Sequence, residues 1–74
     1  MSREIPTIMP NHNLSRRELE VLKLASQKYL SKEIADKLEL SVNTIRNHRS
    51  NIFSKLEVHD ITGAVAIAKE RGLI

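Results

Sequence analysis

Polar side chains recur at helical spacing between residues 41 and 56, where each one could meet the edge of a nucleic-acid base. Arg46, Asn47 and Ser50 fall on one side of the helix that this segment would form, and Asn43 lies beside them. An Arg can donate two hydrogen bonds to guanine, and an Asn can bond twice to adenine. A plain solvated helix face would carry similar residues. We predict that these four side chains contact base edges.

A second group of residues flanks this face and is suited to the DNA backbone. Thr44, Asn51 and Lys55 lie on one flank, and Lys32 begins the preceding predicted helix. Phosphate contacts of this kind position a duplex without specifying its sequence. His48 lies between the core and this flank, and we expect it to have a structural role with a hydrogen bond to phosphate.

These polar residues need a scaffold that buries one face of their helix and leaves the other face exposed. Apolar residues at helical spacing supply it, namely Ile34, Ala35, Leu38, Leu40, Val42, Ile45, Ile52 and Leu56. Ala35 is small, as required where the two helices would cross most closely. Arg49 is expected to lay its stem along the core edge with its head in solvent. The pattern predicts a helix-turn-helix whose second helix enters the DNA major groove.

Positive charge is concentrated on the same segment. Between residues 40 and 56 the chain has three bases and no acid, whereas the whole chain has 12 Lys and Arg against 9 Asp and Glu. The rest of the chain is therefore balanced, and the net charge of +3 comes from this segment. A positive charge that is gathered on one element attracts phosphate.

Composition argues against several other classes of function. The 74 residues make one small domain, and the sequence has no Cys for a disulfide or a thiolate metal site. His12, His48 and His59 lack the spacing of metal ligands, so we expect neither a metal nor a cofactor. The sequence has no Gly-rich phosphate loop and no carboxylate pair suited to a cleft, so an enzyme is not expected. No apolar run is long enough to span a bilayer, and the cytoplasm is the expected location.

Helix-boundary signals divide the chain into four helices and predict an all-α fold. The helices are expected at about 15–27, 31–38, 41–56 and 60–71. Ser15 and Glu18 form a capping box, and Ser31, Ser41 and Asp60 are expected to cap the other three helices.

Other segments mark the limits of this four-helix region. Residues 1–13 contain both prolines and are expected to be a flexible arm or a linker remnant, which leaves 14–74 as the domain. Gly72 is expected to cap the last helix at its C-terminus. Leu30 is expected to pack against the core where the second helix begins.

Several short motifs occur together at a spacing typical of one family. They are Leu14-Ser15-x-Arg17-Glu18, Val21-Leu22-x-Leu24-Ala25, Ser31-Lys32-Glu33-Ile34-Ala35-x-x-Leu38, Ser41-x-x-Thr44-Ile45-Arg46-x-His48, Ile52-x-x-Lys55-Leu56-x-Val58, Ala64 and Gly72-Leu73. Through them the chain resembles the LuxR/FixJ (GerE-type) DNA-binding domains, a type that also forms the output domain of response regulators. The resemblance implies a four-helix transcription regulator that binds double-stranded DNA, and it places the base-reading positions at Arg46, Asn47 and Ser50.

Three positions depart from the family pattern. Lys28 and Glu57 stand where the family usually has glycine, and Ile61 stands where it usually has arginine. At the first two positions we expect altered loops or non-glycine residues with a positive φ angle. At the third, any ion pair of the family arginine would be absent.

The resemblance also implies a dimer that forms through the fourth helix. Gly63, Ala66, Ile67 and Glu70 lie away from the core stripe of that helix and form the expected interface. Two-fold pairing would match a pseudo-palindromic DNA site. In the alternative, helix 60–71 binds a regulator or RNA polymerase, and the chain is a protein-interaction module.

Overall fold

The computed structural model describes residues 14–74, and this part of the chain contains four helices and no strand. The helices are α1 (Arg16–Ser26), α2 (Ser31–Leu38), α3 (Val42–Leu56) and α4 (Ile61–Glu70). The predicted all-α fold is therefore confirmed, and each helix begins and ends within one residue of its expected limits. The arm predicted at 1–13 lies outside the described residues.

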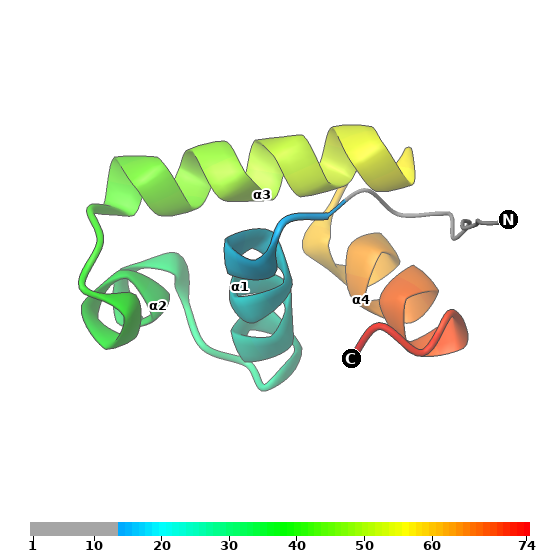
Figure 1. Ribbon diagram of the computed structural model, residues 1–74, viewed down its shortest axis with the longest axis horizontal. Coiled ribbons are helices and arrows are strands. Elements are labelled where there is room, and N and C mark those ends of the chain that lie inside the picture. The colour runs from blue at the N-terminus through cyan, green and yellow to red at the C-terminus, as the bar shows by residue number, and fades with distance from the viewer. Residues whose placement is uncertain (1–13) are drawn as a thin grey trace, which may run out of the picture.

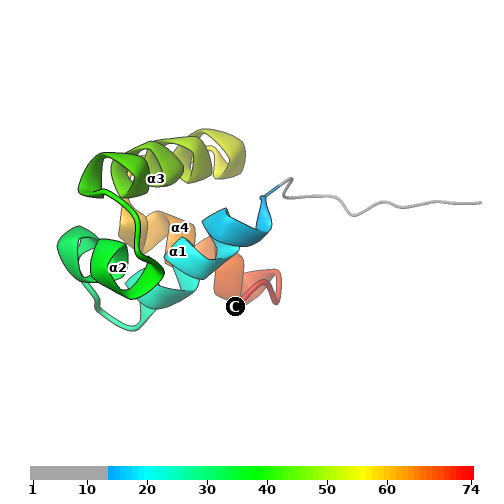
Figure 2. The ribbon, with the colours of Figure 1, turned by 60° about the vertical axis from the view of Figure 1, so that its left-hand side comes forward.

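The long helix α3 forms one layer over the other three helices. Figure 1 shows it running across the top of the molecule, with α2, α1 and α4 beneath it from left to right. The view in Figure 2 shows the same two layers from another side. Helix α1 is central in the lower layer, because it packs against α2, α3 and α4. One side of α3 therefore faces the protein along its whole length, and the other side faces away from it.

A single aliphatic core fills the space between the two layers. Its largest fully buried side chains are Leu22, Ile34, Ile45, Ile52 and Val21. Burial of such side chains contributes about 1.5–3 kcal/mol each and is the main force that holds the helices together. The expected helix-turn-helix positions all join this core: five are buried and three, Leu38, Leu40 and Val42, are half-buried against it. The predicted scaffold of the second helix is thus confirmed.

Side-chain caps fix where three of the helices begin. The hydroxyl of Ser15 accepts from the Glu18 amide at 3.1 Å, and the Glu18 carboxylate accepts from the Ser15 amide at 2.9 Å. Ser41 accepts from the Thr44 amide at 3.0 Å, and Asp60 accepts from the Gly63 amide at 2.8 Å. These three predicted caps are confirmed, and each satisfies a helix N-terminal amide that would otherwise lack a partner.

The expectations for the start of α2 were wrong in two respects. Ser31 is not the cap but the first residue of the helix, and Leu30 occupies the cap position. Because Leu30 has no polar side chain, the carboxylate of Glu33 instead accepts from the Leu30 amide at 2.8 Å. Leu30 does not pack into the core as expected, since it remains 69% exposed.

Every helix is followed by a residue in the left-handed region of backbone space. These residues are Lys28 (φ 77°), Glu39 (φ 58°), Glu57 (φ 58°) and Gly72 (φ 73°). The predicted positive φ at the two positions without the family glycine is therefore confirmed. Gly72 follows the cap residue Arg71 of α4, and the amide of Leu73 then donates to the carbonyl oxygen of Ala68 at 2.8 Å, which closes that helix.

Candidate nucleic-acid interface

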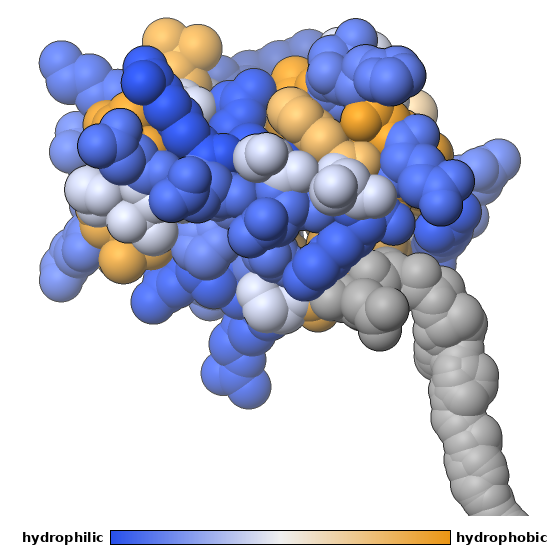
Figure 3. All heavy atoms as spheres, turned by 90° about the horizontal axis from the view of Figure 1, so that it is seen from above, coloured by the Kyte–Doolittle hydropathy of each residue, from blue (hydrophilic) through white to orange (hydrophobic). Residues whose placement is uncertain are grey.

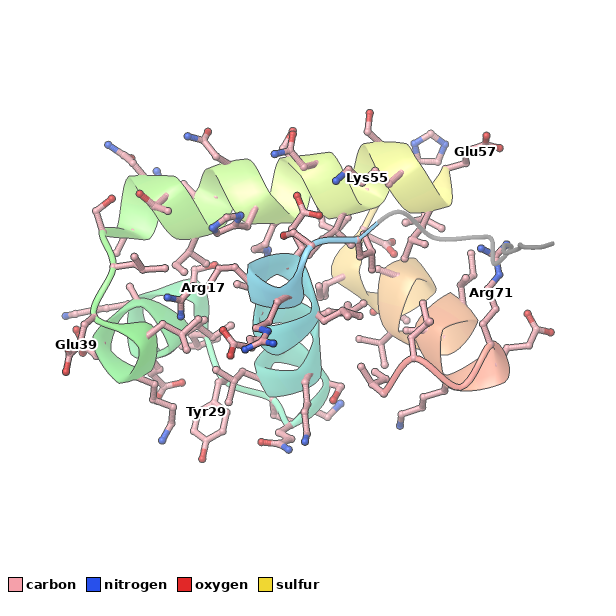
Figure 4. All side chains as sticks on the ribbon, in the orientation of Figure 1. Arg17, Tyr29, Glu39, Lys55, Glu57 and Arg71 are labelled. Atoms are coloured by element: carbon pink, nitrogen blue, oxygen red, sulfur yellow. The ribbon has the colours of Figure 1, made fainter. Side chains whose placement is uncertain are left out.

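The outer face of α3 carries the four residues that were predicted to read bases. Asn43, Arg46, Asn47 and Ser50 are all exposed. Figure 3 looks down onto this side of the molecule and shows a mostly hydrophilic surface, and Figure 4 shows polar side chains that project outward along the helix. The structure thus brings the four side chains together on one accessible face, and their contact with bases stays a prediction.

The residues predicted to bind phosphate differ in how available their polar groups are. Lys32 and Asn51 are exposed, whereas Thr44 is half-buried and its hydroxyl lies 2.9 Å from the hydroxyl of Ser41. Thr44 therefore helps Ser41 to begin α3. With the Ser41 hydroxyl as the donor of this contact, the Thr44 hydroxyl can still donate to a phosphate oxygen.

Lys55 has a partner within the protein that sequence reasoning missed. Its Nζ atom donates to Oε1 of Glu18 at 2.8 Å, and the Glu18 side chain is only 5% exposed. Figure 4 shows Lys55 on α3 close to the start of α1. The pair joins residues 37 positions apart in the sequence, and it fastens the C-terminal half of α3 to the N-terminus of α1.

The environment of Glu18 favours its charged form. Burial raises the pKa of this carboxyl. The hydrogen bonds from Lys55 and from the Ser15 amide, together with the charges of Lys55 and nearby His48, lower the pKa by more than burial raises it. The net result is a pKa below the ordinary value of 4.5. His48 is half-buried, in agreement with its expected place between the core and the flank.

Arg49 also contacts the protein, through its head group. Its Nη1 atom donates to the Ser31 hydroxyl at 2.7 Å, and the residue is half-buried. The guanidinium thus has a protein partner that the sequence did not predict, at the edge of the core where its stem was expected. The hydrogen bond joins the middle of α3 to the first residue of α2, so the two helices of the helix-turn-helix are connected by a polar contact as well as by the core.

The outer side of α4 holds the four residues expected at a dimer interface. Ala66 and Glu70 are exposed, whereas Ile67 is half-buried and packs partly against the core. Gly63 is small for a reason within the chain, because a Cβ atom there would lie 3.3 Å from Oδ1 of Asp60 and 3.4 Å from Cβ of Val58. The pairing itself stays a prediction, and Ala66 and Glu70 are its most accessible residues.

Comparison with known proteins agrees with this geometry. Residues 12–68 match the family model described as bacterial regulatory proteins, luxR family. The chain belongs to this family. The resemblance found in the sequence is confirmed, and the luxR family is one of helix-turn-helix transcription regulators, which are not enzymes.

Individual luxR-family relatives show the same relationship. The chain is 38% identical over 66 residues to the transcriptional regulatory protein LiaR of Bacillus subtilis, covering 89% of this chain and 31% of LiaR. It is 44% identical over 61 residues to the response regulator VraR of Staphylococcus aureus, covering 82% of this chain and 29% of VraR. The chain thus spans about a third of the length of these relatives.

Solved structures of two regulators resemble the four-helix fold closely. The response regulator ChrA of a heme-sensing two-component system superposes with a TM-score of 0.82 at 36% identity, over 89% of this chain and 33% of ChrA. The transcription factor GerE superposes with a TM-score of 0.78 at 35% identity, over 81% of this chain and 90% of GerE.

Within residues 14–74, no helix is long and apolar enough to cross a membrane.

Proposed function

We propose that this luxR-family chain binds double-stranded DNA sequence-specifically and regulates transcription, with α3 lying in the major groove. The observation that carries the proposal is the division of α3 into two faces. Ile45, Ile52 and Leu56 are buried on one face, while the four predicted base-reading side chains are exposed on the other. A helix presented in this way fits the major groove, which is about 12 Å wide.

The length and chemistry of α3 support the proposal. Its 15 residues span about 22 Å, enough to follow the groove past several base pairs. Arg46 is suited to guanine and Asn47 to adenine, and a well-made bidentate pair discriminates against a wrong base by about 1–3 kcal/mol. Four residues flank this face as proposed phosphate ligands, namely Lys32, Thr44, Asn51 and Lys55, with His48 as a further donor.

The proposal predicts a binding pattern that can be measured directly. Duplexes should be selected from a random pool by the intact chain, and the bound site should then be mapped by footprinting. We expect one recurrent half-site sequence, with affinity that falls linearly with the logarithm of salt concentration. Binding with no sequence preference, or affinity that salt does not change, would contradict the assignment.

We further propose that two copies bind together through the outer side of α4. Such a dimer would place two α3 helices about 34 Å apart on a pseudo-palindromic site. The support is the exposure of Ala66 and Glu70 beside the half-buried Ile67, since a small residue allows another helix to approach closely. The interface would be small, so pairing should tighten on DNA.

The charge-introducing variant Ala66→Glu tests the dimer without disturbing the core. Ala66 is exposed, whereas Ile67 packs partly against buried residues. We expect Ala66→Glu to abolish cooperative binding to a two-half-site duplex and to preserve weak binding to a single half-site. The control is Lys28→Glu, an exposed charge reversal in the α1–α2 loop. Equal cooperativity in the parent and Ala66→Glu would show that α4 is not the interface.

The same outer side of α4 carries the alternative function. If it binds a regulator or RNA polymerase rather than a second copy, Ala66→Glu should impair transcriptional control while cooperative DNA binding stays intact. A pure protein-interaction module would bind no duplex in a salt-dependent way. The two outcomes separate the alternatives with one variant.

A further inference from the structure

A shallow pocket lies beside the base-reading face, between the N-terminus of α2 and the middle of α3. It has a volume of about 420 Å³ and is lined by Ser31, Arg46, Arg49, Ser50 and Phe53. Two of these residues are permanently charged cations and two are hydroxyl donors, and none of the five is a carboxylate. The pocket therefore has the chemistry of an anion site, with Phe53 as its apolar wall.

The guanidinium of Arg49 is held in place at this pocket. Nη1 donates to the Ser31 hydroxyl at 2.7 Å, which fixes the head group and leaves its other N–H donors for another acceptor. Ser31 is the first residue of α2, so the first-turn amides of that helix lie at the same end. The fixed guanidinium is the main source of anion affinity in the pocket, because Arg binds phosphate particularly well.

The pocket is continuous with the proposed base-reading face, because Arg46 and Ser50 belong to both. An anion bound here would therefore lie at the edge of any duplex that the outer face of α3 contacts. We infer that this pocket binds one backbone phosphate of that duplex, with Arg49 as its principal ligand and Ser31 as the residue that positions Arg49. The inference rests on the proposed DNA binding and adds a phosphate ligand beyond the flank residues.

Arg49→Gln tests the inference, with Ser31→Ala as the matched control. Both variants alter the same hydrogen bond, but only Arg49→Gln removes a charge. We expect Arg49→Gln to lower the slope of log affinity against log salt by about one, equally on the selected site and on random duplexes. Ser31→Ala should keep the parent slope. Equal slopes for the parent and Arg49→Gln, or the same change in both variants, would overturn the phosphate role.

A scan of the DNA itself identifies the bound phosphate. In the selected duplex, single phosphates are replaced one at a time by neutral methylphosphonates, and the affinity of each duplex is measured. The parent should weaken at a small set of positions, and Arg49→Gln should be insensitive at one of them while remaining sensitive at the others. If Arg49→Gln keeps the whole parent pattern, the inference is wrong. If the parent itself binds no duplex, the proposed function fails, and the inference fails with it.

Discussion

The two halves of α3 use their cations differently. Arg46, in the first half, is exposed and forms no ion pair with any residue from 14 to 74. Lys55, in the second half, donates to the buried carboxylate of Glu18. One helix thus has an exposed cation in its first half and an anchoring cation in its second half. The charge of a residue on a polar helix face does not by itself reveal which of the two roles it has.

The largest effect that would sharpen this comparison is the loss of Lys55. Lys55→Met leaves the buried Glu18 carboxylate with the Ser15 amide but without its cation, and we expect the free energy of unfolding to fall by about 3 kcal/mol. This is the lower end of the range for a broken buried pair, because the Lys55 side chain is 35% exposed. Urea unfolding at pH 7 measures the change.

The control for this variant is an exposed ion pair on α1. Nη1 of Arg17 lies 3.1 Å from Oε1 of Glu20, and both side chains are exposed. Arg17→Met should therefore lower stability by less than about 1 kcal/mol. If Lys55→Met lowers the free energy of unfolding by no more than Arg17→Met does, Lys55 does not anchor α3. The contrast between the two halves of the helix then disappears.

Changes in the first half of α3 should act on DNA binding alone. Arg46→Ala and Asn47→Ala are each expected to weaken binding to the selected site by about 1–3 kcal/mol and to relax specificity at one base pair. Their melting temperatures should match that of the parent, because both side chains are exposed. Competition assays with selected and random duplexes measure the effect. An equal loss on both kinds of duplex would assign these residues to the backbone instead.

The smallest expected effect is the response of the anchor to acid. The pKa of Glu18 is lowered in the folded state, so its stabilising contribution is complete above about pH 4.5 and is lost as the pH falls through the folded-state value. One proton changes stability by at most about 1.4 kcal/mol per pH unit. Glu18→Gln should therefore lose less stability than the parent on acidification from about pH 5 to pH 3. A parallel decline in both proteins would place the acid sensitivity elsewhere.

Local signals made the helices predictable, since the caps at Ser15, Ser41 and Asp60 depend on residues only three positions apart. The start of α2 was harder, because its cap position holds Leu30 and the compensating carboxylate comes from Glu33. Ser31 has the side chain of a typical N-cap residue, so the sequence did not show that the helix already includes it.

The two polar contacts of α3 could not be predicted from local spacing. Arg49 and Ser31 are 18 positions apart, and Lys55 and Glu18 are 37 apart, so both depend on how the helices cross. One signal was nevertheless present. Glu18 lies three and four positions before Val21 and Leu22, on the apolar stripe of α1, and an acid at such a position needs a buried partner. The exposed face of α3 was easier to identify, because helical period alone separates it from the core.

At the non-glycine residues with a positive φ angle that follow three of the helices, substitution could raise the free energy of unfolding. At Lys28, Glu39 and Glu57 a side chain occupies backbone space that glycine or asparagine adopts more readily, at a cost of about 1–2 kcal/mol for each residue. All three are exposed and lie outside α3. Substitution of these loop residues by glycine or asparagine is therefore a direct route to a more stable protein. Such changes would leave the outer face of α3 unaltered.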